Sequence, residues 1–232
     1  MVASALFAAD PPAGLLRKVL EVESQSEAER AHFAYRQRVR IEDMEPGGRK
    51  LGEYRETRDV VFSADGKRHE EPVGRPFHAL MRLVLTPEDF RDIREVQPFL
   101  FTRDQLSLYQ TQSRGEETID GIPCWVLQVV PRQILDGQRL FEGLIWVHQT
   151  ENAVIRLQGR AVPQIVNSKR ENLFPRFTTT RAQVEGKYWF PQSTLADDVL
   201  EFRTGAIRMR MNIQYENYKR FTADSRITYD VK

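Results

Sequence analysis

The side chains that could carry chemistry are few in this chain and scattered along it. None of the four histidines belongs to an HExxH or His-x-His arrangement, and they stand at His32, His69, His78 and His148. His69 is followed by Glu70 and Glu71, but only Glu71 would share its face in an extended strand. Because a zinc or iron site needs several converging ligands, no metal site is predicted. A solvated polar strand is the preferred interpretation of this stretch.

Nucleophilic catalysis has no recognisable motif either. Ser193 lies in strand-like sequence and lacks the GxSxG context of a hydrolase serine. The single cysteine, Cys124, lies between Pro123 and Trp125 in an apolar run, whereas a reactive thiol needs exposure and nearby positive charge. The phosphate-binding patterns GxGxxG and GxxxxGKS/T are missing. We therefore expect no enzyme activity, no catalytic residue and no cofactor.

The composition narrows the class of protein further. Of the 232 residues, 41% are hydrophobic and 29% charged, which is enough apolar content for a packed core. Lys and Arg number 34 against 33 Asp and Glu, so the net charge of +1 gives no general attraction for nucleic acid. Two basic stripes are interpreted as solvated sheet faces rather than anion-binding or nucleic-acid-binding surfaces: Arg36, Arg38 and Arg40, and then Arg208 and Arg210.

The first ten residues are mostly small and apolar, and they precede a Pro-Pro pair. Two interpretations stay open for residues 1–10: the remnant of a signal peptide whose basic start is missing, or a disordered terminus. No later segment approaches the ~20 apolar residues that a membrane span needs. We therefore expect a soluble protein that is at most peripheral to a membrane.

The first secondary-structure element expected from the sequence, and so the first that could position a site, is a helix. Residues 13–31 place apolar side chains close to helical spacing, which predicts one amphipathic helix. From Phe33 to Ile41 the spacing changes to strict alternation, which indicates a strand that ends at the Pro-Gly-Gly turn of residues 46–48. Two more strands are expected at Lys50 to Phe62 and near Lys67 to Val73.

A helical insert interrupts the strands. Thr86 and Pro87, followed by two acidic residues, form a typical helix start, and apolar residues recur at helical spacing from Phe90 to Val96. A second short helical piece is expected over residues 102–109. The strands then return, and turn signals every 8–12 residues or so favour a curved antiparallel sheet in a single domain over residues 11–232. The clearest later strands are residues 122–130, 144–148, 154–161, 177–184, 188–200 and 207–215.

Four stretches of the second half carry a family resemblance by their order and spacing. They are DGIPCWVLQV (120–129), GLIWVH (143–148) with VIR at 154–156, GKYWFP (186–191) and YENYKRF (215–221). Through them the chain resembles bacterial periplasmic outer-membrane lipoprotein-sorting proteins, the LolA/LolB-like superfamily, and within it a secreted branch. The likeness extends loosely over residues 13–230.

The resemblance implies an α+β fold that is mainly antiparallel β: a strongly curved open half-barrel with an N-terminal helix and a helical insert over its concave face. In the carriers of this superfamily the hollow is apolar and holds the acyl chains of a lipoprotein. The ligand-binding residues expected on this basis are Trp146, Trp189, Met209, Met211, Ile213 and Tyr215. The alternative for each of them is ordinary core beneath the insert.

The carriers also have an Arg-Pro pair whose arginine holds the helical lid closed. Arg75-Pro76 is the only comparable pair here, so the resemblance assigns lid control to Arg75. The strand that follows the pair in the carriers is replaced here by the helical stretch.

The function expected from the sequence is non-catalytic binding of an apolar ligand, a lipid or the acyl chain of a lipoprotein, in the periplasm or outside the cell. The alternative is an envelope protein–protein interaction or sensor module with a filled core and no lipid ligand. The corresponding partners are a lipid or acylated protein, or another envelope protein, and no nucleic acid.

Overall fold

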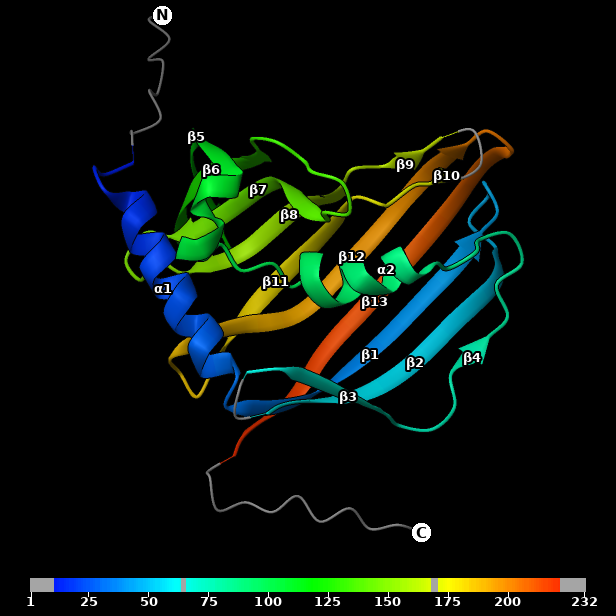
Figure 1. Ribbon diagram of the computed structural model, residues 1–232, viewed down its shortest axis with the longest axis horizontal. Helices are drawn as coiled ribbons and strands as arrows, with labels where there is room; N and C mark the ends of the chain where they lie inside the picture. Colours follow the sequence, from blue (N-terminus) through cyan, green and yellow to red (C-terminus); the bar gives the residue numbers. More distant parts are fainter. Residues whose placement is uncertain (1–10, 64–65, 168–170, 222–232) are drawn as a thin grey trace, which may run out of the picture.

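The computed structural model describes residues 11–63, 66–167 and 171–221 of the chain. The expected signal remnant or disordered terminus at residues 1–10 lies outside the described residues. An 11-stranded antiparallel sheet dominates the described part, with the order β3-β2-β1-β13-β12-β11-β8-β7-β6-β5 and with β4 beside β2 (Figure 1). Strands from the two ends of the chain therefore meet in the middle of the sheet, where β1 pairs with β13.

The first part of the chain supplies one helix and one end of the sheet. Its elements are α1 (Leu15–Arg30), β1 (Phe33–Met44), β2 (Lys50–Phe62), β3 (Arg68–Pro72) and β4 (Phe77–His78). The predicted helix and first three strands are confirmed, whereas the two-residue strand β4 carries no pattern long enough to predict it.

Residues 79–108 form a segment that we call the cover. It contains α2 (Pro87–Arg91), the π-helix η1 (Asp92–Val96) and the 3₁₀ helix η2 (Arg103–Leu108). The helix start predicted at Thr86 is confirmed: its hydroxyl accepts a hydrogen bond from the backbone N–H of Asp89, whose carboxylate accepts from the Thr86 backbone N–H in return. The helix itself changes to π geometry after Arg91.

The remaining strands build the curved wall of the sheet. They are β5 (Tyr109–Ile119), β6 (Ile122–Pro131), β7 (Leu140–His148), β8 (Val154–Val162), β11 (Phe177–Val184), β12 (Tyr188–Phe202) and β13 (Gly205–Arg220). A separate two-stranded ribbon pairs β9 (Ile165–Val166) with β10 (Glu171–Asn172).

A glycine pair allows the wall to curve tightly. Gly143 on β7 and Gly159 on β8 are register partners, and the buried ring of Phe141 lies against both. A Cβ atom on Gly143 would lie 2.1 Å from the backbone oxygen of Gln158 and 2.7 Å from the Phe141 ring. Glycine is therefore required here by the close approach of backbone and ring.

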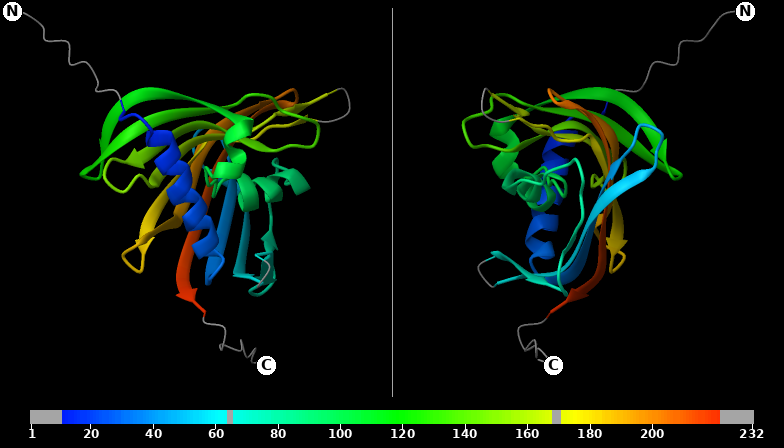
Figure 2. Two further views of the ribbon diagram at one scale, coloured as in Figure 1. Left: turned by 60° about the vertical axis from the view of Figure 1, so that its left-hand side comes forward. Right: turned by 90° about the vertical axis from the view of Figure 1, so that its right-hand side faces the viewer.

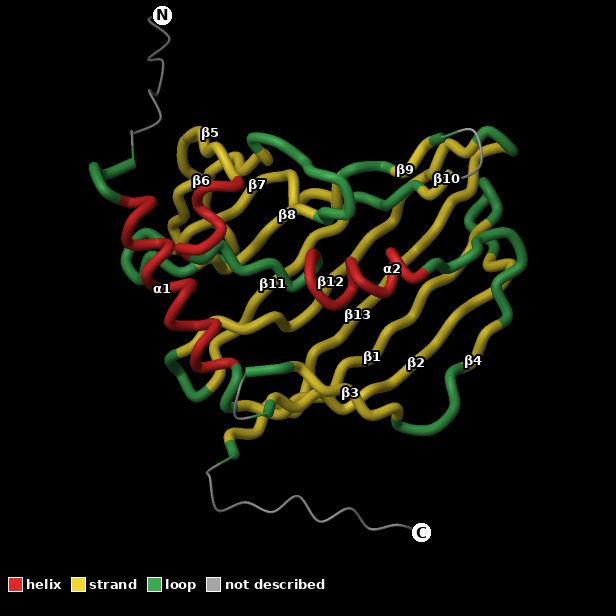
Figure 3. Tube along the Cα trace, in the orientation of Figure 1, coloured by secondary structure: helices red, strands yellow, loops and turns green. Residues whose placement is uncertain are grey.

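The helices all lie on the concave side of the sheet, with α1 crossing one half and the cover crossing the other (Figure 2). The tube view separates this helical layer from the strands behind it (Figure 3). The expected fold class, an open half-barrel with an N-terminal helix and a helical insert over its concave face, is confirmed. Among the described residues, no helix is long and apolar enough to cross a bilayer.

Candidate functional site

The candidate site is the space between the cover and the concave face of the sheet, which we call the hollow. Strict alternation along β1 and β13 sends Ile41, Met209 and Met211 inward, and Leu83 and Ile93 of the cover meet them. The cavity that remains between them has a volume of about 30 Å³. This is room for a few water molecules rather than for an acyl chain, because a cavity of about 10–15 Å³ by this measure holds one water.

The structure divides the six predicted ligand-binding residues between the two faces of the sheet. Four of them share the buried apolar cluster of the concave side, and these are Met209, Met211, Ile213 and Tyr215. Among these four, Met209 and Met211 border the cavity itself. Trp146 and Trp189 belong instead to a smaller cluster with Cys124 and Ile155 on the opposite face.

Both tryptophans of that outer cluster are anchored to carboxylates. The indole N–H of Trp146 donates to Glu117 over 2.8 Å, and that of Trp189 donates to Glu151 over 2.6 Å. Cys124 beside them is buried, and burial raises the pKa of its thiol to about 11. This cluster lies across the sheet from the hollow, so the two tryptophans do not line it.

Arg75, the residue to which the resemblance assigns lid control, lies on the side of the sheet opposite the hollow. It is exposed in the connection between β3 and β4 and borders a groove on the outer face with Arg38 and Gln214. Two other arginines, Arg139 and Arg181, contact the cover directly.

Arg181 on β11 joins three elements in the interior. Its Nη1 atom lies 2.9 Å from Oε1 of Glu23 on α1, and the same nitrogen donates to the carbonyl oxygen of Val154 over 3.1 Å. Its Nη2 atom donates to the carbonyl oxygen of Phe99 in the cover over 2.5 Å. Glu23 also accepts from the backbone N–H of Phe101 over 3.3 Å. The pair therefore fixes α1 and the middle of the cover to the wall of the sheet.

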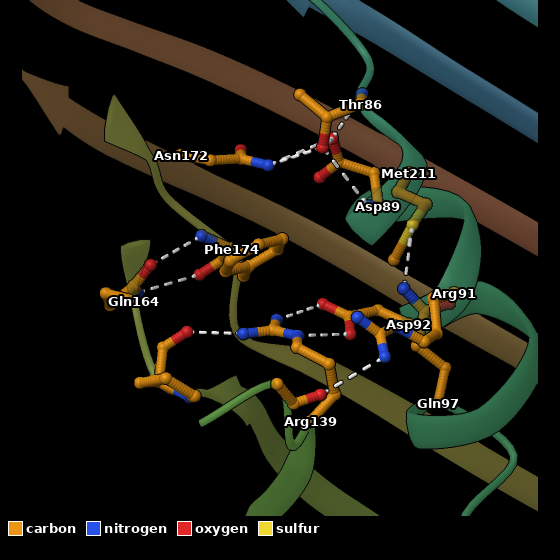
Figure 4. A network of polar contacts seen from close by, with 12 residues as sticks. Thr86, Asp89, Arg91, Asp92, Gln97, Arg139, Gln164, Asn172, Phe174 and Met211 are labelled. Carbon is orange, nitrogen blue, oxygen red and sulfur yellow. Dashed lines mark hydrogen bonds and ion pairs between the residues drawn. The ribbon is translucent and has the colours of Figure 1, made fainter. Parts of the chain in front are cut away.

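Arg139 at the start of β7 holds the other part of the cover (Figure 4). Its guanidinium donates to both carboxylate oxygens of Asp92 and lies 3.8 Å from the centre of the Phe174 ring. A further hydrogen bond runs to the carbonyl oxygen of Pro163. Burial raises the pKa of Asp92 to about 6, although Arg139 acts in the opposite direction.

Two more polar clusters fasten the cover at its edges. The carboxylate of Asp43 on β1 accepts from the backbone N–H groups of Met81 and Arg82 over 2.8 and 2.6 Å. The amide of Asn172 donates to the hydroxyl of Thr86 over 2.5 Å, beside the cap of α2 (Figure 4). The first cluster joins the backbone of the cover to a side chain of the sheet, and the second joins a side chain of the cover to a side chain of the ribbon.

A line of polar atoms also crosses the floor of the hollow. The hydroxyl of Thr179 donates to the backbone oxygen of Gln97 over 2.8 Å and lies 2.7 Å from the hydroxyl of Thr194. The side-chain amide of Gln97 donates to the sulfur of Met211 over 3.5 Å (Figure 4). The cover thus rests on the apolar floor through directed polar contacts as well as through apolar packing.

The carboxylates nearest the cavity, Asp89 and Asp92, are already engaged by hydrogen bonds to Thr86, Asn172 and Arg139. In the part of the chain that the structure describes, no three His, Cys, Asp or Glu side chains gather as a metal site.

Comparisons with known proteins place the chain among solved structures only at a distance. No family model matches it, and no curated protein matches it. It is similar to a DUF1329 family protein from Desulfovibrio piger, with 15% identity, a TM-score of 0.46, and coverage of 94% of this chain and 96% of that one.

Two further similar structures come from other bacteria. One is a LolA superfamily protein from Nitrosomonas europaea, with 14% identity, a TM-score of 0.37 and coverage of 92% and 95% of the two chains. The other is an outer membrane lipoprotein-sorting protein domain from Vibrio parahaemolyticus, with 12% identity, a TM-score of 0.40 and coverage of 90% and 95%. The superfamily named for the first is the one that the sequence motifs resemble.

Proposed function

We propose that the protein is a non-catalytic binding protein that shelters an apolar chain, a lipid or the acyl part of a lipoprotein, in the hollow beneath its cover. The observation that carries the proposal is an apolar cavity bounded on one side by the sheet and on the other by the cover. Its lining includes Ile41, Met209 and Met211 from the sheet and Leu83 and Ile93 from the cover. Methionine adapts its shape to different apolar ligands, and this favours binding without a fixed ligand outline.

In this proposal the structure is the closed state, and ligand entry requires part of the cover to lift. Residues 79–97 are fastened at Asp43, Asn172 and Arg139, and when they lift, these polar groups can take water as a replacement partner. The following residues are held at Phe99 and Phe101 by the shielded pair of Arg181 and Glu23. Residues 79–97 are therefore the moving part, and Arg139 takes the controlling role that the sequence resemblance assigned to Arg75.

The second candidate, an interaction module with a filled core and no lipid ligand, is favoured by one observation. The concave cluster leaves a cavity of only about 30 Å³. The two candidates differ in the volume of the hollow. In a binding protein the hollow enlarges when residues 79–97 lift and admits a ligand, whereas in an interaction module the core stays filled.

The compartment proposed with either function is the periplasm or the outside of the cell. It is supported by the sequence resemblance, and fractionation of producing cells tests it. Recovery of the protein in the cytoplasm would contradict it.

Uptake of cis-parinaric acid, a fluorescent fatty acid, tests the hollow directly. Met211→Ala removes volume from the floor and should strengthen uptake, whereas Ala161→Leu adds volume beside the cavity and should weaken it. Leu195→Ala is the matched control, because Leu195 is exposed on the sheet away from the cavity. The proposal would be contradicted if no form took up the fatty acid. It would also be contradicted if Leu195→Ala changed uptake while Met211→Ala and Ala161→Leu did not.

A further inference from the structure

A groove of about 540 Å³ runs over the outer face of β1, β2 and β13. This face is on the side of the sheet away from the helices, as the ribbon views show (Figure 2). We call it the outer groove, and its polar lining includes Arg38, Arg40, Arg55, Arg75, Asn212 and Gln214. It lies across the sheet from the hollow, so a ligand there does not depend on the proposed function.

The strand register arranges this lining in two rows. Arg38 lies between Gln214 of β13 and Thr57 of β2, and Arg40 lies between Asn212 and Arg55 in the same order. Arg40 and Arg55 are thus direct cross-strand partners of like charge. Such a pair destabilises a sheet, so folding alone does not favour it.

Two carboxylates beside the groove only partly neutralise its arginines. Glu53 contacts both Arg40 and Arg55, at 3.2 and 2.9 Å, and Glu42 contacts Arg40 at 2.7 Å. These two glutamate side chains are only 12% and 13% exposed, whereas those of Arg40 and Arg55 are 51% and 56% exposed. A ligand in the groove therefore meets guanidinium groups first.

The remaining charges leave an excess of positive charge. Lys50 shares the same two glutamates, and Arg38 has Glu216 at 2.5 Å. Among the described residues, Arg75 has no carboxylate within 4.0 Å. The lining of the outer groove thus holds four arginines and a single glutamate, Glu56, whose buried carboxylate is already bonded to Tyr54 and Arg58.

We propose that the outer groove binds an extended acidic peptide segment of a partner protein. Arg38 and Arg40 are two positions apart on one strand, so their side chains repeat about every 6.6 Å. Carboxylates at alternate positions of an extended peptide repeat at the same interval, and each can accept a pair of hydrogen bonds from one guanidinium.

Two other features of the outer groove favour a peptide over a membrane surface. The amides of Asn212 and Gln214 lie beside the arginines and can hydrogen-bond to a peptide backbone. Phe77 and Val73 at the rim are 45% and 41% exposed and offer apolar contact to neighbouring peptide side chains. A recessed groove lined by arginines and amides fits a narrow strand better than a flat layer of lipid head groups.

The test uses the whole protein and a fluorescein-labelled peptide with three glutamates at alternate positions, followed by fluorescence anisotropy. The double variant Arg38→Gln/Arg40→Gln should weaken binding by about tenfold or more, the effect of losing one charge-assisted hydrogen bond. Arg208→Gln/Arg210→Gln is the matched control, because these arginines have the same spacing on β13 and are both paired with Asp197. The control should change binding by less than about twofold.

Three outcomes would overturn the proposal. The first is no binding of the peptide by the wild-type protein at low salt. The second is equal loss in both double variants, which would mean general charge attraction. The third is binding of vesicles of phosphatidylglycerol and phosphatidylcholine that depends on Arg38 and Arg40 while the peptide fails to bind, which would assign the groove to a membrane surface.

Discussion

Arg181 on β11 and Glu23 on α1 are 158 positions apart in the sequence, yet they form an ion pair in which the side chains are 1% and 0% exposed. Arg181 also donates to the backbone oxygens of Val154 and Phe99. One pair of residues therefore joins the N-terminal helix, the wall of the sheet and the cover.

Breaking this pair from one side should destabilise the fold strongly. Arg181→Met leaves the Glu23 carboxylate buried without its counter-charge, and the expected loss in the free energy of unfolding is about 3–5 kcal/mol. Urea unfolding followed by circular dichroism measures it. The double variant Glu23→Leu/Arg181→Met should recover most of that loss, because it removes both buried charges. A single variant as stable as the wild type would contradict the role of the pair.

Stability should depend on pH through Asp92. Burial raises the pKa of Asp92 to about 6 from an ordinary value of 3.8, so the folded state binds a proton more readily than the unfolded state. The contribution is fully present below about pH 4 and is lost as the pH rises through about 6. In urea unfolding at several pH values, Asp92→Asn should flatten this part of the profile. A variant profile with the same slope as the wild type would assign the dependence to other groups.

The Asp43 carboxylate should control how firmly the edge of the cover is held. Asp43→Ala removes the acceptor for the part-buried backbone N–H groups of Met81 and Arg82, and each lost hydrogen bond should cost about 0.5–1.5 kcal/mol. Hydrogen exchange at these two amides should accelerate. In the proposed function, uptake of cis-parinaric acid should also become faster. Unchanged exchange would mean that other contacts hold this edge.

The glycine pair of β7 and β8 should tolerate no side chain. Gly143→Ala places a Cβ atom against the Gln158 backbone oxygen and the Phe141 ring, and the expected destabilisation is about 1–3 kcal/mol or more. Gly47→Ala is the matched control, because nothing lies within 4 Å of a Cβ atom at that position. Thermal unfolding of the two variants should differ clearly, and equal melting temperatures would contradict this account of the curvature.

The fold could be predicted from the sequence wherever the spacing of apolar residues matches the face of the element that is buried. The alternation along residues 207–215 is complete because β13 lies in the middle of the sheet, with a covered inner face and a solvated outer face. The start of α2 was predictable because the capping box is a local interaction. The two-residue strands β4, β9 and β10 were not, since their pairing depends on partners rather than on their own sequence.

The polar contacts of the site depend on residues far apart in the sequence, and this is why they were missed. One signal was present for Glu23, which follows Leu15 and Val19 on the apolar stripe of α1 at intervals of four. Arg181 likewise shares the inward parity of Phe177 and Thr179 on β11. A charged residue at a position that the spacing predicts to be buried indicates that its charge is paired. Only the fold, however, identifies the partner. Trp146 was placed by motif likeness, and strand parity sends it to the other face.

Native mass spectrometry with solvent extraction, on the protein purified from the cells that produce it, tests the central claim most directly. The account predicts a lipid or acyl chain bound at near one-to-one stoichiometry, and it predicts that Ala161→Leu reduces the bound fraction. An apo mass that stays unchanged after incubation with fatty acids and phospholipids would contradict the binding hollow and favour the interaction module.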